Sequence, residues 1–158
     1  MKTLSLLRHA KAERDSLDGS DFARSLNGRG RRDAARMGEE MRGLGLRFDW
    51  VLASPARRVV ETVEEAGELV PIYEMRIYNA SSKQLYDLIR STDDSVQSLL
   101  MVGHNPGFEQ IAAQLTDDAI EDFPTAALVE IELSVKHWRN LKERNGRLTR
   151  FIKPKDLD

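Results

Sequence analysis

The stretch SLLMVGHNPGFEQIAAQL, residues 98–115, predicts a strand, a turn and a helix in direct succession. Its first five residues form a largely apolar run of strand length, and Gly103 ends that run. The apolar side chains that follow recur at helical spacing: Phe108, Ile111, Ala112 and Leu115. A strand that leads straight into a helix is typical of βαβ units, so this stretch favours an α/β fold.

Two earlier stretches repeat this arrangement. Residues 4–7 form a short apolar run, and a helical pattern follows from residue 28 to residue 44. Residues 50–53 form a second run, and Pro55 after it can occupy the first turn of another helix. The remaining pattern predicts short strands at residues 72–73, 129–133 and 148–152, the last as an edge strand, and a helix around residues 85–89.

Strands that alternate with helices predict a sheet whose neighbouring strands run parallel. Crossovers between such strands are right-handed, and ligands bind beyond the carboxyl ends of the strands. We therefore expect a single α/β domain over residues 1–158, with a central, mostly parallel sheet and helices on both faces.

Composition excludes several other classes of protein. The chain has 158 residues, 41% of them hydrophobic and 32% charged, as in an ordinary globular domain. Cysteine is absent, so disulfides and thiolate metal sites are impossible. The net charge of -2 argues against a general nucleic-acid binder, and no apolar run reaches the length of a membrane span. We expect a cytoplasmic monomer that binds neither nucleic acid nor membrane.

Polar residues cluster where three of the predicted strands end. Arg8 and His9 follow the first strand, Arg57 and Arg58 lie just beyond the second, and His104 follows the third. If these strands are neighbours in one parallel sheet, the clusters converge on a single crevice. Two of the three histidines in the chain would then lie beside at least two arginines.

Such a group of side chains suits phosphoryl transfer. Arginine binds phosphate oxygens through a planar fork and stays charged at any working pH. A neutral histidine can attack phosphorus, and a second, protonated histidine can stabilise the charge that develops on the oxygens. Arginines can supply the positive charge themselves, and the sequence contains neither a metal-binding HExxH motif nor a glycine-rich phosphate loop. We therefore expect no metal and no cofactor.

Taken singly, each of these residues has a simpler interpretation. A lone histidine after a strand is usually a surface or capping residue, and adjacent arginines usually include one solvated side chain. Asp15, Asp18 and Asp21 lack the spacing of a calcium loop, which favours a solvated loop. His137, beside Trp138, is expected to have a structural or surface role.

Three blocks of the chain, within residues 4–133, resemble the histidine phosphatase superfamily. Leu7-Arg8-His9 resembles its Arg-His-Gly signature, residues 54–62 resemble its Ser-Pro-Leu-x-Arg-Ala-x-x-Thr block, and Gly103-His104-Asn105 resembles its third block. The resemblance implies that His9 is the phosphorylated nucleophile and that His104 is the second catalytic histidine. It also implies that Arg8 and Arg58, rather than Arg57, bind the phosphoryl group.

Within that superfamily, the chain is most similar to the small SixA-type phosphohistidine phosphatases. It is short, and residues 21–30 resemble their Asp-x-x-Arg-x-Leu-x-x-x-Gly segment, which adds Arg24 as a further phosphate-binding candidate. Ala10 replaces the signature glycine and fits only if its backbone needs no positive φ. Larger members place an acidic proton donor between the second and third blocks, where Glu74 is the best candidate in this chain.

A weak or missing proton donor suggests a substrate class. Expelling an alkoxide needs a proton donor, whereas imidazole leaves more readily because the pKa of histidine is about 6.5. We therefore expect a phosphatase that acts on phosphohistidine in a protein. A small-molecule phosphomonoesterase of the same superfamily and a non-catalytic phosphate-binding module are the alternatives. The module would need the arginines but not the pair of histidines.

Overall fold

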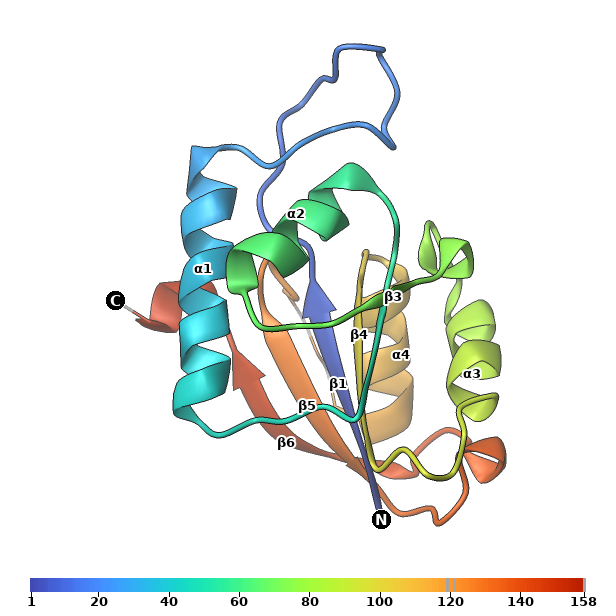
Figure 1. Cartoon of the computed structure of the whole chain (residues 1–158). Coiled ribbons are helices and arrows are strands. Elements are labelled where there is room, and N and C mark those ends of the chain that lie inside the picture. The colour runs from blue at the N-terminus through green and yellow to red at the C-terminus, as the bar shows by residue number, and fades with distance from the viewer. Residues whose placement is uncertain (119, 121, 158) are drawn as a thin grey trace.

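The computed structural model describes residues 1–118, 120 and 122–157, and within them six strands form one sheet (Figure 1). The strand order is β3-β2-β4-β1-β5-β6. The strands are β1 (Lys2–Arg8), β2 (Trp50–Ala53), β3 (Ile72–Tyr73), β4 (Ser98–Gly103), β5 (Leu128–Leu133) and β6 (Gly146–Ile152).

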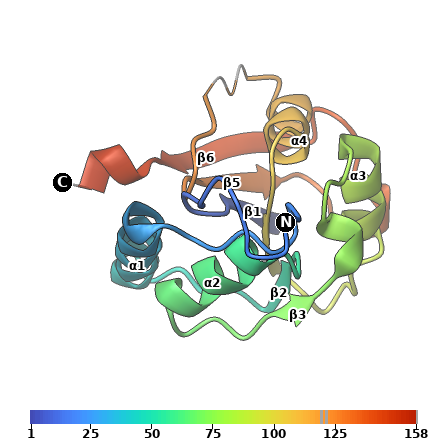
Figure 2. The ribbon, with the colours of Figure 1, turned by 90° about the horizontal axis from the view of Figure 1, so that it is seen from above.

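Four α-helices in the described part of the chain cover both faces of this sheet (Figure 2). Helices α1 (Gly28–Gly43) and α2 (Arg57–Ala66) pack on one face, and α3 (Ser82–Arg90) and α4 (Gly107–Thr116) pack on the other. Three short 3₁₀ helices complete the set: η1 (Met75–Ile77), η2 (Trp138–Asn140) and η3 (Pro154–Leu157). None of the described helices combines the length and apolarity needed to cross a membrane.

The direction of the strands changes across the sheet. Strands β3, β2, β4 and β1 are parallel neighbours, whereas β5 runs antiparallel to β1 and β6 runs antiparallel to β5. The prediction of an α/β fold with a mostly parallel sheet and helices on both faces is confirmed.

Alternating side chains of the central strands fill two separate cores. In β1, Leu4 and Leu6 are fully buried against the α3 and α4 side, while Leu7 joins the core under α1 and α2. Burying one such side chain contributes about 1.5–3 kcal/mol to folding. Because both faces of β1 and β4 are buried, apolar side chains in these strands do not simply alternate with polar ones.

A buried lysine stabilises the end of the sheet opposite the predicted site through hydrogen bonds. Lys2 Nζ donates to the carbonyl oxygens of Asp94 at 2.6 Å and Val96 at 2.9 Å, and it lies 5.6 Å from the centre of the Trp138 ring. Trp138 Nε1 donates to the same Val96 oxygen. His137 pairs with Asp94 nearby, in keeping with the structural role expected for it.

The strand order brings the three polar clusters together. Strands β2, β4 and β1 are neighbours, and their carboxyl ends lie at one edge of the sheet (Figure 1). Backbone pairing continues past each strand end, because His9 N donates to Gly103 O and Ser54 N donates to Val102 O, both at 3.0 Å. The segment from residue 12 to residue 27 projects beyond this edge.

Candidate active site

A cleft of about 490 Å³ opens at the carboxyl ends of β1, β2 and β4. Its histidines and one of its arginines are almost fully buried, with 8% of His9, 5% of His104 and 4% of Arg58 exposed. The residues that line the cleft are Arg8, His9, Lys11, Ala12, Asp21, Arg24, Arg58, Tyr78, Asn79, His104, Asn105 and Thr125.

His9 is held as a neutral imidazole with one nitrogen free. Its Nδ1 lies 2.8 Å from the carbonyl oxygen of Ala10, which can only accept, so Nδ1 carries the proton. The other nitrogen, Nε2, therefore keeps its lone pair. Burial lowers the pKa of His9 to about 3, outweighing the opposing effect of the Ala10 hydrogen bond. The ring is thus neutral at neutral pH, and its Nε2 is available as a nucleophile.

The backbone after His9 is fixed by helix α2. Ala10 N donates to Thr62 Oγ1 at 2.9 Å, and the Thr62 hydroxyl donates in turn to Arg58 O at 2.7 Å. Ala10 does not adopt a positive φ, so the condition for alanine in place of the signature glycine is met. The first and second sequence blocks are therefore hydrogen-bonded to each other.

His104 is engaged at both ring nitrogens. Arg58 Nη2, which can only donate, lies 3.2 Å from Nδ1, so Nδ1 is an acceptor and Nε2 bears the proton. Nε2 donates to Ser54 Oγ at 2.8 Å. Burial, and next the charge of Arg58, lower the pKa of His104 to about 4. His104 is therefore neutral rather than doubly protonated at neutral pH.

Asp21 accepts several hydrogen bonds on one side of the cleft. Its carboxylate accepts from Tyr78 OH at 2.6 Å, from Arg58 Nη2 at 3.1 Å and from Arg24 Nε at 3.0 Å. Its backbone oxygen accepts from Arg58 Nη1 at 2.9 Å. These hydrogen bonds, with that of Tyr78 the strongest, lower the pKa of Asp21 to about 2, so the side chain stays ionised.

Arg8 approaches the cleft from the end of β1. Its Nη1 donates to Phe123 O at 3.0 Å, and Asn105 Nδ2 donates to the same oxygen at 3.0 Å. Burial is the main cause that lowers the pKa of Arg8 from its usual value. The Nε atoms of Arg8 and Arg58 are buried without a partner in the described part of the chain, so neither guanidinium uses all of its donors.

The structure brings together five of the six site residues predicted from sequence: Arg8, His9, Arg24, Arg58 and His104. Arg57 points outward and pairs with Glu61 at 3.2 Å, with more than half of its side chain exposed. Arg58, and not Arg57, is therefore among the residues that line the cleft.

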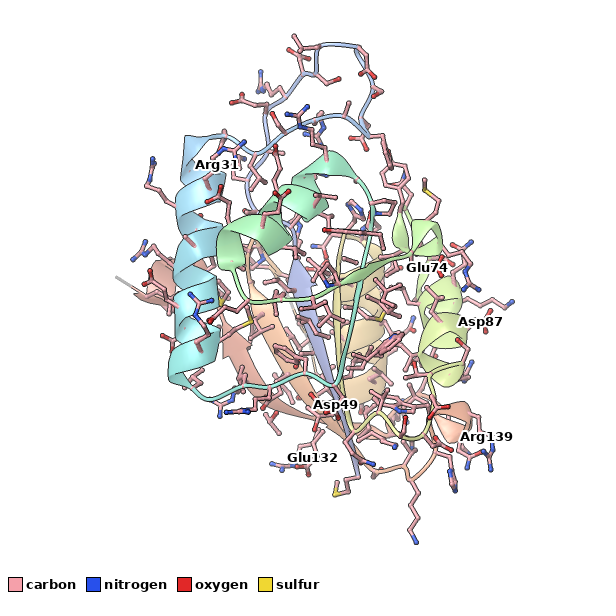
Figure 3. All side chains as sticks on the ribbon, viewed as in Figure 1. Arg31, Asp49, Glu74, Asp87, Glu132 and Arg139 are labelled. Carbon is pink, nitrogen blue, oxygen red and sulfur yellow. The ribbon has the colours of Figure 1, made fainter. Side chains whose placement is uncertain are left out.

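Glu74 is not brought into the cleft. It caps η1 on the α3 side of the molecule (Figure 3), and its carboxylate pairs with Arg76 at 2.8 Å. It lines a different hollow, together with Trp50 and Ile72. Hydrogen bonds from Arg76 lower the pKa of Glu74 to about 2, so it stays ionised. Its position does not support the expected role of proton donor, because the segment from residue 70 to residue 81 runs along the sheet edge.

Sequence reasoning did not assign Asp21 and Tyr78 to the site. Asp21 was expected in a solvated loop, which describes Asp18, whose carboxylate bonds only Ser16 and Ser20 at the loop tip. The signal for Asp21 was its place at the start of the Asp-x-x-Arg segment, three residues before Arg24. Tyr78 carries no such signal, because only the folded chain places it against Asp21.

Acidic and histidine side chains do not gather into a metal site in the part of the chain that the structure describes. No group of three or more histidine, aspartate or glutamate residues there could hold an ion. The positive charge of the cleft comes instead from its arginines and from Lys11.

Known proteins are similar to this chain in sequence. The family model of the histidine phosphatase superfamily (branch 1) matches residues 4–79. An uncharacterized protein of Mycobacterium tuberculosis strain H37Rv is 32% identical over 161 residues, covering 94% of this chain and 100% of that protein.

Solved structures extend the match over nearly the whole chain. A chain from Agrobacterium tumefaciens, assigned as a phosphohistidine phosphatase SixA, is 29% identical with a TM-score of 0.82, covering 97% of this chain and 99% of the other. The protein histidine phosphatase SixA complexed with tungstate has a TM-score of 0.85 at 22% identity, with 99% of each chain covered. The resemblance seen in the sequence is thereby confirmed: the chain belongs to the histidine phosphatase superfamily and is of the SixA type.

Proposed function

We propose that this protein is a metal-independent phosphatase that removes the phosphoryl group from phosphohistidine in a protein, with phosphorylated His9 as the intermediate. The observation that carries the proposal is a free His9 Nε2 beside buried arginines, in a cleft whose described lining residues include no protonated carboxyl group. Membership of a phosphatase superfamily supports the general reaction. The choice of substrate rests on the chemistry of the leaving group.

In the first step, the lone pair of His9 Nε2 attacks phosphorus and the bond to the substrate nitrogen breaks. Arg8 and Arg58 lie where they can bind the phosphoryl oxygens as charge builds on them. His9 Nδ1 keeps its proton and donates a hydrogen bond to the Ala10 oxygen. This hydrogen bond orients the ring and stabilises the positive charge that the imidazole gains. The substrate leaves as neutral imidazole once its other ring nitrogen has taken a proton from solvent.

In the second step, water attacks the phosphorus of phosphorylated His9, and the bond to Nε2 breaks. His9 departs as a neutral imidazole because Nδ1 already carries a proton, so no further acid is needed. The water loses one proton to solvent, and inorganic phosphate leaves the cleft. Exposed Lys11 and half-exposed Asp21 leave the mouth open to water throughout.

The state of the acidic side chains supports an easily expelled leaving group. Among the described residues that line the cleft, Asp21 is the one carboxylic acid. Its pKa is about 2 and three donors occupy it, so it holds no proton to give at neutral pH. Alkoxide leaving groups need such a proton, whereas protonated phosphohistidine does not.

The SixA structure with tungstate supports the proposal that the cleft binds an oxyanion. Tungstate is a tetrahedral dianion like the phosphoryl group, and the SixA that was solved with it matches this chain over 99% of its length. We infer that the cleft of this protein, with its arginines, binds tetrahedral oxyanions.

The test has two parts, beginning with the intermediate. Incubation with phosphoramidate, followed by rapid quenching, should leave acid-labile phosphate on His9, identified by peptide mapping. His9→Ala should carry no label and lose turnover while still binding tungstate. Label on another residue, or turnover above a few per cent in the variant, would reject His9 as the nucleophile.

The second part compares substrates. The specificity constant kcat/KM should be far higher for a phosphohistidine protein than for p-nitrophenyl phosphate or sugar phosphates. Glu74→Gln should leave turnover of the phosphohistidine protein intact. A preference for sugar phosphates would favour the small-molecule phosphomonoesterase, and tungstate binding without any turnover would favour the phosphate-binding module.

A further inference from the structure

Arg58 has an ionic partner within the chain itself, Asp21. Its side chain is almost fully buried, and a buried guanidinium without a counter-charge would be strongly destabilising. The Asp21 carboxylate supplies that charge, 3.1 Å from Arg58 Nη2. The backbone oxygen of Asp21 accepts a second hydrogen bond, from Arg58 Nη1 at 2.9 Å. Asp21 therefore satisfies the same donors that a phosphoryl oxygen would need.

The two partners differ in how easily they can part. Half of the Asp21 side chain is exposed, and Tyr78 and Arg24 also bond it, so water can replace Arg58 beside it. Arg58 has no such freedom, because it is buried and must exchange one anion for another. Exchange between a carboxylate and a phosphoryl oxygen keeps a charge-assisted hydrogen bond at every stage.

The same nitrogen of Arg58 also controls His104. Nη2 donates both to Asp21 Oδ2 and to His104 Nδ1, at 3.1 Å and 3.2 Å. While Arg58 donates to it, Nδ1 cannot bind a proton. If Arg58 Nη2 turns toward a phosphoryl oxygen, the lone pair of His104 Nδ1 is free to bind a proton. His104 Nε2 can meanwhile keep its own proton and its hydrogen bond to Ser54 Oγ.

We propose that Asp21 is a positioning residue that holds Arg58 until a phosphoryl group binds and then yields it to that group, and that this exchange lets His104 Nδ1 take up a proton. This inference rests on the proposed function in one respect, because it takes a phosphoryl group as the ligand. The new Nδ1 proton comes from solvent and is donated to a phosphoryl oxygen.

The charges around His104 fit such a response. Arg58 from α2, Arg8 from β1 and Arg24 from the projecting segment all disfavour its protonation, and Asp21 favours it. The rings of His9 and Tyr78 each lie 5.4 Å from its own, centre to centre. A bound dianion adds two negative charges to this group, which favours a second proton on the imidazole.

Sulfate is a suitable probe because it is a tetrahedral dianion that does not itself titrate between pH 5 and 8. Sulfate binding to the wild-type protein should take up about one proton, so that Kd rises up to tenfold for each pH unit. The ¹⁵N chemical shifts of His104 should show its pKa rising by more than one unit when sulfate binds. Absence of both effects overturns the proposal.

Matched variants assign the effect to residues. His104→Gln should abolish the proton uptake, whereas His9→Gln should keep it. Asp21→Asn should bind sulfate several-fold more tightly at pH 7.5, because the competing charge is gone. Asp18→Asn removes the same charge from the loop tip, away from Arg58, and should change Kd less than twofold. Weaker binding by Asp21→Asn would show that Asp21 only supports Arg58 and does not compete.

These measurements need no turnover, so they separate this inference from the proposed function. Sulfate binding that is coupled to His104, in a protein that forms no phosphorylated His9, would reject the proposed reaction and leave this inference standing. Labelled His9 together with sulfate binding that does not depend on pH would reject this inference and leave the proposed reaction standing. The ¹⁵N measurement uses the wild-type protein, so it decides the matter even if Asp21→Asn fails to fold.

Discussion

Arg57 and Arg58 are adjacent in the sequence but have opposite surroundings. Arg58 is buried between Asp21 and His104, whereas Arg57 is exposed and pairs with Glu61. A hydrogen bond to a charged group contributes roughly 1.5–3 kcal/mol, so Arg58→Ala should lower kcat/KM by about one to two orders of magnitude or more. Arg57→Ala should change it less than about threefold, because an exposed ion pair contributes little. Equal losses in steady-state assays of the two variants would contradict this assignment.

At this scale the sequence indicates some of the cleft residues and misses others. Arg8, His9 and His104 could be placed because each directly follows a strand, and a strand end in a parallel sheet has a predictable position. Asp21 and Tyr78 could not, because they meet only after two separate loops have folded. No local pattern in the sequence encodes that contact.

Among the elements, helix α2 fixes the end of β1 through Thr62. Thr62→Val should leave the buried Ala10 N–H without an acceptor, which costs about 1–3 kcal/mol of stability. Because Ala10 follows His9, kcat should fall more than KM rises. Thr62→Ser keeps the hydroxyl and should restore both properties. Urea unfolding and steady-state kinetics on the two variants check this, and a normal kcat in Thr62→Val would show that the bond does not aim His9.

Helix α1 contains two glycines with different surroundings. A Cβ atom at Gly30 would overlap the backbone of Lys11, whereas a Cβ at Gly43 would meet nothing within 4 Å. Gly30→Ala should therefore lower Tm by several degrees and disturb the segment that leads into the cleft. Gly43→Ala should leave Tm unchanged or slightly raised, because alanine favours helix. Thermal unfolding of both variants distinguishes this from a general effect of glycine replacement in α1, which would shift both equally.

The elements themselves could be predicted well from periodicity. The strands at residues 98–102 and 50–53 and the helix from residue 28 agree closely with β4, β2 and α1. The antiparallel direction of β5 was not predicted. Alternation of Val129 and Ile131 with acidic residues indicates which face is buried, but it carries no information about strand direction.

For the whole molecule, the buried histidines predict acid sensitivity. The unfolded chain binds a proton on each histidine near pH 6.5, whereas folding lowers the pKa of His9 to about 3 and of His104 to about 4. Between the folded-state pKa of each histidine and 6.5, the unfolded state binds more protons than the folded state, so the free energy of unfolding falls as pH falls. The loss should reach about 1.4 kcal/mol per pH unit for each histidine. Urea unfolding from pH 7.5 to pH 4.5 should show it, and His9→Asn should flatten the slope; parallel curves would contradict the prediction.

The sheet order is what turns three sequence clusters into one site. The sequence indicates that three strands end in polar residues, but β2, β4 and β1 had to be assumed to be neighbours. That order depends on how the two cores divide the apolar faces between α1 and α2 on one side and α3 and α4 on the other. Such a division is a property of the packed molecule and not of any single stretch.

Six separate segments of the chain supply the cleft, and Arg8 bonds to a carbonyl oxygen 115 residues away. Closing loops of that length costs entropy before the contacts compensate for it, so a topology with so many distant pairings folds slowly. Neither half of the molecule, cut between α2 and β4, contains a complete set of ligands. The cleft can therefore form only when both parts of the chain have packed into one sheet.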